Sequence, residues 1–173
     1  MPAAVPPHKQ GRKLASYAQR FHMAELATAA YEKFEVSDFE AQRSGLSYTS
    51  DTLALLRKEY PDNAFSLILG ADSFFEFENW HAPEDICRNA RLLVAAREYA
   101  REHSSLSEHA RHLEERFGAR VALIPAPLLD ISSMHIRELL AAGKKSAAQY
   151  LPAAVYRYIQ AEGLYVPEKE GKL

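Results

Sequence analysis

Residues 65–80 read Phe-Ser-Leu-Ile-Leu-Gly-Ala-Asp-Ser-Phe-Phe-Glu-Phe-Glu-Asn-Trp, and this stretch decides the fold. Its apolar run stops at Gly70, which is the pattern of a strand buried on both faces of a parallel sheet. Gly70 and Asp72 then lie at the carboxyl end of that strand, the edge where open α/β sheets bind ligands. An acid at Asp72 and the flat ring of Trp80 could hold a sugar hydroxyl and a planar ring. The alternative is that Asp72 caps the next helix and Trp80 fills the core.

Two further apolar runs predict two more strands, at residues 91–97 and 120–125. The segment between them has helical periodicity, with Ser105 and Glu108 spaced as a capping box at its start. Its expected core stripe is Leu106, Ala110, Leu113 and Phe117. Strand, helix and strand at this spacing predict an α/β fold with a parallel sheet flanked by helices.

Length and composition restrict the class of protein. A chain of 173 residues predicts a single domain over 1–173, and a net charge of -2 predicts no general attraction to nucleic acid or to an anionic membrane. The single cysteine, Cys87, excludes an internal disulfide and fits a reducing compartment. No apolar stretch is long enough to span a bilayer, and no secretory signal is recognised, so the expected location is the cytoplasm.

The residues before the central strand contain a proline-rich segment and two helices. Prolines predict that residues 1–13 form a loop presenting His8 and Lys9, although a disordered tail is the alternative. Ser16 and Gln19 are spaced as a capping box, and residues 34–36 are a weak strand candidate. A further helix is expected to begin at Thr49 or Ser50 and to end near Tyr60.

Residues 131–140, read as Ile-Ser-Ser-Met-His-Ile-Arg-Glu-Leu-Leu, begin a helix that we expect to run to Gly143. Two hydroxyls, of Ser132 and Ser133, and the guanidinium of Arg137 would make a compact phosphate cradle at the helix start. The alternative is an ordinary capped helix whose arginine faces solvent. His109 and His112 lie one helical turn apart, but no third ligand completes a zinc site at the usual spacing, so no metal site is predicted.

Read together, these segments resemble bacterial nicotinate mononucleotide adenylyltransferases from about residue 2 to about residue 165. The resemblance implies a Rossmann-like nucleotidyltransferase fold, and transfer of the adenylyl group of ATP to nicotinate mononucleotide in NAD biosynthesis. The residues that carry it are Pro6-Pro7-His8-Lys9, then Glu40, Arg43, Gly45, Ser47-Tyr48-Thr49 and Asp51-Thr52, then Gly70-Ala71-Asp72 with Trp80, and finally Ile131-Ser132-Ser133 with Ile136-Arg137.

The resemblance also implies roles for individual residues. Trp80 would stack on the pyridine ring, while Tyr48 and Thr49 would fix the nicotinate carboxylate. The remaining implied contacts are Gly70 and Asp72 to the ribose and adenosine, His8 and Lys9 to the phosphates, and Ser132, Ser133 and Arg137 to the triphosphate of ATP. Mg²⁺ is the implied metal, bound to the phosphates of ATP, and no protein residue is implied as a metal ligand.

The chain departs from the family pattern in two places. Met134 stands where the family usually has threonine or another small residue, which removes one hydroxyl near the phosphates. The family's first strand and its His-x-Gly-His or Thr-x-Gly-His loop have no counterpart after Met1, so the first βαβ portion of the fold and the catalytic histidines are expected to be missing. The expectation is therefore that Met1 is an internal methionine and that these 173 residues alone are poorly active.

Two other functions stay open at this point. The chain could be a non-catalytic nucleotide-binding remnant that keeps a pyridine pocket. It could also be a related adenylyltransferase whose acceptor is nicotinamide mononucleotide or phosphopantetheine. The Ser47-Tyr48-Thr49 segment together with Trp80 favours an acidic pyridine as the acceptor.

Overall fold

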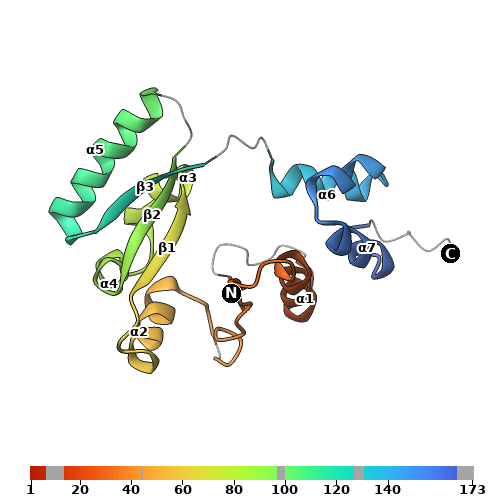
Figure 1. Ribbon diagram of the computed structural model, residues 1–173, viewed down its shortest axis with the longest axis horizontal. Coiled ribbons are helices and arrows are strands. Elements are labelled where there is room, and N and C mark those ends of the chain that lie inside the picture. The colour runs from red at the N-terminus through yellow and green to blue at the C-terminus, as the bar shows by residue number, and fades with distance from the viewer. Residues whose placement is uncertain (7–13, 44, 97–99, 127–130, 167–173) are drawn as a thin grey trace. The chain divides into compact units, whose positions relative to one another are not determined.

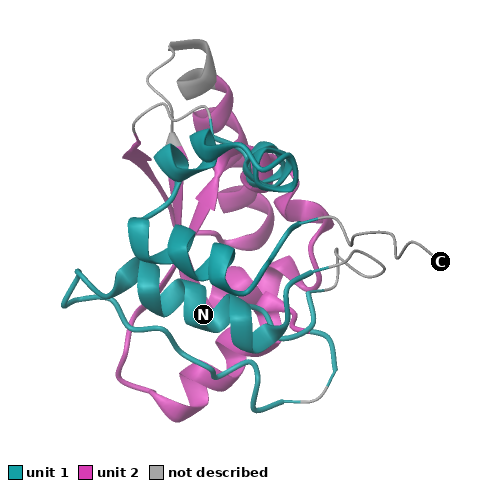
Figure 2. Cartoon of the chain, turned by 90° about the vertical axis from the view of Figure 1, so that its right-hand side faces the viewer, with its two compact units in different colours: residues 1–46, 130–173 teal, residues 47–129 magenta. Residues whose placement is uncertain are grey.

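The computed structural model describes residues 1–6, 14–43, 45–96, 100–126 and 131–166 (Figure 1). His8 and Lys9 therefore lie outside the described residues. The chain forms two compact units, coloured separately in Figure 2. Unit 1 combines Met1–Leu46 with Asp130–Leu173, and unit 2 is Ser47–Leu129. The expectation of a single domain over 1–173 stays a prediction.

Unit 2 is the α/β part of the chain. Its strands and helices alternate along the chain, as the sequence predicts. The elements are α2 (Thr49–Glu59), β1 (Phe65–Gly70), α3 (Ala71–Phe75), the 3₁₀ helix η2 (Phe77–Asn79), α4 (Pro83–Asn89), β2 (Ala90–Ala96), α5 (Ala100–Phe117) and β3 (Val121–Pro125).

The three strands form one parallel sheet in the order β1-β2-β3, which confirms the predicted class. In its register Leu69 lies opposite Val94, and Val94 lies opposite Leu123. Because the pairing is parallel, the carboxyl ends of all three strands share one edge, and Gly70 ends β1 at that edge. The prediction for residues 65–70 is confirmed with both of its boundaries.

Only one face of the sheet carries the buried core of unit 2. Leu69, Leu92 and Val94 are buried on that face, where they pack with Phe74, Phe77 and Ile86. Ile68, on the opposite face, is 66% exposed. The prediction that β1 is buried on both faces is therefore wrong, because the helices of unit 2 that join this core cluster cover a single face.

Helix α5 covers this face, and Figure 1 shows it running along the sheet. Leu106, Ala110 and Leu113 are buried and Phe117 is partly buried, so the predicted stripe is confirmed. Ser105, however, lies inside α5, which already begins at Ala100. The predicted capping box at Ser105 is wrong, because Ser-x-x-Glu spacing also occurs within a continuous amphipathic helix.

Unit 1 consists of helices contributed by both ends of the chain (Figure 2). The predicted capping box is confirmed: Ser16 Oγ accepts from the amide of Gln19, and Gln19 Oε1 accepts from the amide of Ser16. The buried residues Leu140, Ala147, Val155 and Ile159 form its core. Its elements are α1 (Tyr17–Thr28), α6 (Ser133–Ala141), the 3₁₀ helix η3 (Lys145–Tyr150) and α7 (Ala153–Ala161).

Residues 34–36 do not form a strand, so that prediction is wrong. Phe34 is 65% exposed, and its ring lies 5.5 Å from the ring of Tyr31 in a turn. A short apolar segment becomes a strand only where another strand offers it hydrogen bonds, and the described residues around it offer none. Within the described residues, no helix is long and apolar enough to cross a membrane.

Candidate functional site

The candidate site in unit 2 begins at the carboxyl end of β1. Gly70 has an ordinary extended backbone, with φ -76°, and a Cβ atom added to it would meet no heavy atom within 4 Å. Neither backbone strain nor crowding by the described residues therefore requires a glycine here, and its effect is to leave the backbone open to a ligand. Asp72 is exposed in the first turn of α3, whose N-cap is Gly70, so the alternative that Asp72 is the cap is wrong.

Trp80 follows η2, and its amide donates to the carbonyl oxygen of Phe77 (3.1 Å). Its ring centroid lies 5.7 Å from that of Phe77, and the side chain is only partly buried against the core cluster. Trp80 thus has one part in the core and one part accessible. Trp80 can therefore fill part of the core and also offer an accessible ring surface to a ligand.

The start of α2 lies close to the segment that follows Trp80. Tyr48 immediately precedes α2, and its ring lies 4.3 Å from the ring of His81 at an angle of 33°. Thr49 is the first residue of α2, and the carbonyl oxygen of Tyr48 accepts from Thr52 Oγ1 (3.1 Å). The Tyr48–His81 pair therefore brings the predicted residues Tyr48 and Thr49 near the chain segment of Trp80.

His81 is a site residue that the sequence analysis missed. Its position directly after Trp80 is the only local signal, and a ring contact with Tyr48 cannot be inferred from sequence spacing. The side chain of Ser50 was missed as well. It is 3% exposed, and its hydroxyl has no hydrogen-bond partner among the described residues. Both groups are polar and lie at the start of α2 or beside it.

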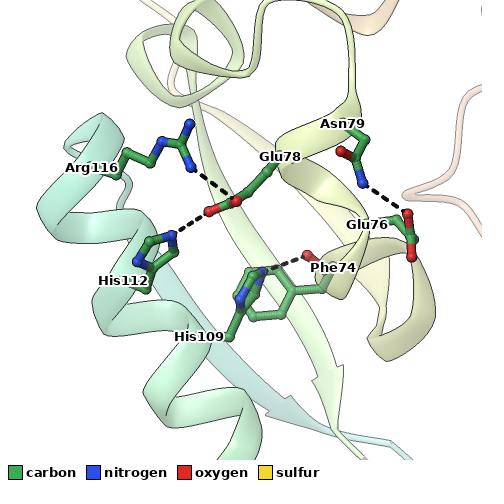
Figure 3. Close-up of polar contacts among 7 residues, drawn as sticks. All are labelled: Phe74, Glu76, Glu78, Asn79, His109, His112 and Arg116. Atoms are coloured by element: carbon green, nitrogen blue, oxygen red, sulfur yellow. Dashed lines mark hydrogen bonds and ion pairs between the residues drawn. The ribbon is translucent and has the colours of Figure 1, made fainter.

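An ion-pair cluster holds the turn that carries Trp80 (Figure 3). Two side chains of α5 point toward the carboxylate of Glu78 in η2: His112, through Nε2, and Arg116, through Nη1 at 3.1 Å. One turn earlier, His109 Nε2 donates to the carbonyl oxygen of Phe74 (3.1 Å). Helix α5 therefore holds the segment before Trp80 at two places, the carbonyl group of Phe74 in α3 and the carboxylate of Glu78 in η2.

This cluster predicts that Glu78→Gln loosens the turn. We expect a loss of about 1 kcal/mol in the free energy of unfolding, because partly exposed ion pairs contribute up to about that amount. The midpoint of thermal unfolding should fall by roughly 2–4 °C, and the emission of Trp80 should shift to longer wavelength. Glu76→Gln is the matched control, since Glu76 is exposed on the same turn and only accepts from Asn79 Nδ2 (3.0 Å). Equal effects of the two substitutions would contradict the prediction.

The second candidate site lies at the start of α6 in unit 1. Ser132 is the N-cap, and its Oγ accepts from the amide of His135 (3.0 Å). Arg137 Nη2 donates to Ser133 Oγ (3.4 Å), so the structure brings the three predicted residues together. Both serines are exposed while Arg137 is partly buried. The exposed hydroxyls and the guanidinium share one helix end, which is an arrangement suited to an anion.

Arg137 also lies near Tyr165, whose pKa is raised by burial and lowered by the charges of Arg137 and Arg20. The balance keeps the phenol neutral, so no buried anion competes for the guanidinium of Arg137. Arg20 is itself partly buried and donates to the carbonyl oxygens of Ala3 (2.7 Å) and Ala4 (3.2 Å). It thereby anchors the segment that leads toward His8 and Lys9.

No group of three or more His, Cys, Asp or Glu side chains that could hold a metal ion occurs among the described residues. The two histidines of α5 are engaged by Glu78 and by the backbone of Phe74.

Comparison with known proteins gives a consistent family. Residues 1–139 match the family described as cytidylyltransferase-like. A protein of Lachnoclostridium phytofermentans named "Probable nicotinate-nucleotide adenylyltransferase" is 36% identical over 166 residues, which are 96% of this chain and 82% of that protein. A protein of Desulfitobacterium hafniense with the same name is 38% identical over 165 residues, which are 95% of this chain and 79% of the relative.

The fold agrees with solved structures. Nicotinic acid mononucleotide adenylyltransferase of Plasmodium falciparum, complexed with NaAD, superposes with a TM-score of 0.73 over 94% of this chain and 79% of that chain. The sequence identity is 20%, so this likeness supports the fold, and it confirms the predicted Rossmann-like nucleotidyltransferase class. On the identity to its relatives over nearly all of its length, the chain belongs to the nicotinate-nucleotide adenylyltransferase family of nucleotidyltransferases.

Proposed function

We propose that the reaction this protein serves joins nicotinate mononucleotide to the adenylyl group of ATP, giving nicotinate adenine dinucleotide and pyrophosphate. That these 173 residues alone are poorly active stays a prediction. A phosphate oxygen of the mononucleotide would attack the α-phosphorus of ATP, and the bond from that phosphorus to the bridging oxygen would break as pyrophosphate leaves. The observation that carries the proposal is the 36% identity to a nicotinate-nucleotide adenylyltransferase over 96% of the chain.

The residues proposed to bind nicotinate mononucleotide lie in unit 2. The accessible part of the Trp80 ring stacks on the pyridine. Thr49 and Tyr48, at the start of α2, hold the nicotinate carboxylate through the Thr49 hydroxyl and backbone amides, which suits a negative group. His81, paired with the Tyr48 ring, fixes the position of that ring.

The residues proposed to bind ATP lie at two helix starts. Gly70 leaves the carboxyl end of β1 open to the ribose, and the exposed Asp72 accepts from its hydroxyls. Ser132, Ser133 and Arg137 hold the triphosphate at the start of α6, where hydroxyls and a fixed guanidinium can donate several hydrogen bonds. His8 and Lys9 are proposed to contact phosphates as well, because their side chains can donate hydrogen bonds to phosphate oxygens.

Mg²⁺ is proposed as the cation that accompanies ATP. Nucleotidyltransferases of this family generally use a divalent metal, and Mg²⁺ typically binds through the substrate phosphates with few protein ligands. This fits described residues that contain no cluster of three metal-binding side chains. In this role the ion is part of the nucleotide substrate. The cytoplasmic location and the absence of nucleic acid as a partner stay predictions.

Trp80 offers a direct test because it is the only tryptophan of the chain. We expect nicotinate mononucleotide to quench its fluorescence in a saturable titration, with nicotinamide mononucleotide binding more weakly because it lacks the carboxylate. Phosphopantetheine, as a third ligand, should leave the emission unchanged. Tighter binding of nicotinamide mononucleotide or of phosphopantetheine would identify that molecule as the acceptor in place of nicotinate mononucleotide. If neither pyridine nucleotide changes the fluorescence or gives a heat of binding by calorimetry, the proposed site is refuted.

A further inference from the structure

A basic pocket opens at the amino-terminal edge of the sheet in unit 2. It has a volume of about 590 Å³, within the range of small-molecule sites. None of the described residues that line it is acidic. Its cationic lining consists of Arg57, Arg88, Arg91 and Arg120. This edge lies at the opposite end of β1 from Gly70, so the pocket is separate from the candidate sites of unit 2.

The four arginines converge because of the strand order. Arg57 and Arg88 lie in the last turns of α2 and α4, which end before β1 and β2 begin. Arg57 Nη1 donates to the carbonyl oxygen of Asn63 (2.6 Å), and Arg88 pairs with Asp85. These two guanidinium groups are therefore held at the rim by contacts within the chain.

The other two arginines, Arg91 and Arg120, lie side by side, and no acidic side chain among the described residues pairs with either of them. The amide of Leu92 donates to the carbonyl oxygen of Arg120 (2.8 Å), and Leu92 pairs with Val121. Arg91, in β2, therefore lies beside Arg120, the residue directly before β3. Like charges at such positions are destabilising. Neither side chain forms a hydrogen bond or ion pair with another described residue. A bound anion would remove this repulsion.

The nearby negative groups are too few to neutralise the pocket. Helices α2, α4 and α5 end at this edge, and each carboxyl end contributes roughly -0.5 of a charge. Asp85 adds one full negative charge beside Arg88. Cys87, in the wall, adds none, because burial first and Glu84 second raise the pKa of its thiol to about 11. Glu84, which acts on the Cys87 thiol, adds a second full negative charge, and the four guanidinium groups then exceed this total by roughly half a unit of charge.

We propose that this pocket binds an oligophosphate, either free or carried on a nucleoside, at a site separate from the candidate sites of unit 2. Guanidinium groups recognise phosphate oxygens through paired hydrogen bonds, and several arginines around one cavity match a chain of several phosphates. The proposal does not depend on the proposed function. It adds a second anion site, at the edge of the sheet opposite to Gly70 and Asp72.

The experiment is calorimetric titration with sodium tripolyphosphate. It uses the Arg137→Ala protein as its background, which removes the proposed ATP contact in α6. We expect saturable binding in this background, and about tenfold weaker binding after Arg91→Ala and Arg120→Ala are added, as for the loss of charged hydrogen bonds at an open site. Arg111→Ala is the matched control, because Arg111 is exposed on α5 and does not line the pocket.

Unchanged affinity in the Arg91→Ala, Arg120→Ala protein, or an equal loss with Arg111→Ala, would overturn the proposal. The absence of tripolyphosphate binding in the Arg137→Ala background would overturn it as well. Titration with ATP identifies the source: tighter binding than tripolyphosphate indicates a nucleotide, and equal binding indicates the free anion. Thermal unfolding without ligand verifies folding, and Arg120→Gln alone serves if the double substitution unfolds. Quenching of Trp80 by nicotinate mononucleotide tests the proposed function separately.

Discussion

Trp80→Ala is expected to weaken the binding of nicotinate mononucleotide by about 30- to 150-fold, while ATP binds as before. Stacking of a flat heterocycle on an aromatic side chain contributes roughly 1–3 kcal/mol, and a tryptophan, which offers the largest ring for it, should contribute about 2–3 kcal/mol. Among the described residues, Phe77 is the only one whose ring contacts the ring of Trp80. The outer part of the Trp80 ring is therefore available to the pyridine. Calorimetry is the measurement, because the substitution removes the fluorophore.

Trp80→Phe is the control for this prediction, because it keeps an aromatic ring on the core and should lose less than tenfold in affinity. Trp80→Ala also removes packing against Phe77, so its unfolding midpoint should fall. Retained ATP binding shows that the protein is folded in the assay. The stacking role would be wrong if the alanine variant bound nicotinate mononucleotide as tightly as the parent, or if the phenylalanine variant bound as weakly as the alanine variant.

The sequence predicts those parts of the fold that depend on residues close together in the chain. Phe65–Gly70 is a strand with the predicted boundaries because an apolar run ends at a glycine. The Ser16–Gln19 capping box forms because both of its hydrogen bonds join residues of one turn. Ser132, Ser133 and Arg137 come together for the same reason, since residues at positions i and i+4 of one helix are neighbours.

The errors come from features that depend on distant residues. An apolar run has the same composition whether helices cover one face of the sheet or two, so the 66% exposure of Ile68 has no sequence signal. The segment at Phe34 fails to become a strand because pairing depends on a partner elsewhere in the chain. The Ser105 pattern is a valid cap only if the helix begins there, and α5 begins at Ala100.

The same distinction applies to the candidate sites. The sequence pattern alone makes Trp80 a candidate, and the resemblance to a family adds Tyr48 and Thr49. The contacts that hold these residues in place join positions far apart in the sequence. Tyr48 contacts His81, and Glu78 is held by His112 and Arg116 of α5. Spacing along the chain gives no information on these pairs. The sequence thus identifies candidate ligand-binding residues, and the structure identifies the residues that position them.

Arg137→Ala is expected to weaken the binding of ATP by about 30- to 150-fold and to leave the binding of nicotinate mononucleotide unchanged. Hydrogen bonds to charged groups contribute roughly 1.5–3 kcal/mol, and the loss of a guanidinium that faces a triphosphate should lie near the upper end. Arg137→Lys keeps the charge without the paired donors, so it should recover only part of the affinity.

The stability of the Arg137→Ala protein should change little, which makes its binding defect interpretable. The guanidinium pairs with the exposed hydroxyl of Ser133, so its removal leaves no buried group without a partner there. Arg137 also lowers the pKa of Tyr165, and its loss would raise that pKa further, which keeps the phenol neutral and creates no new charge. Calorimetric titration with ATP and Mg²⁺ is the measurement. Equal affinity of the alanine variant and the parent would remove Arg137 from the triphosphate site, whereas full recovery by lysine would indicate that the position needs only a positive charge.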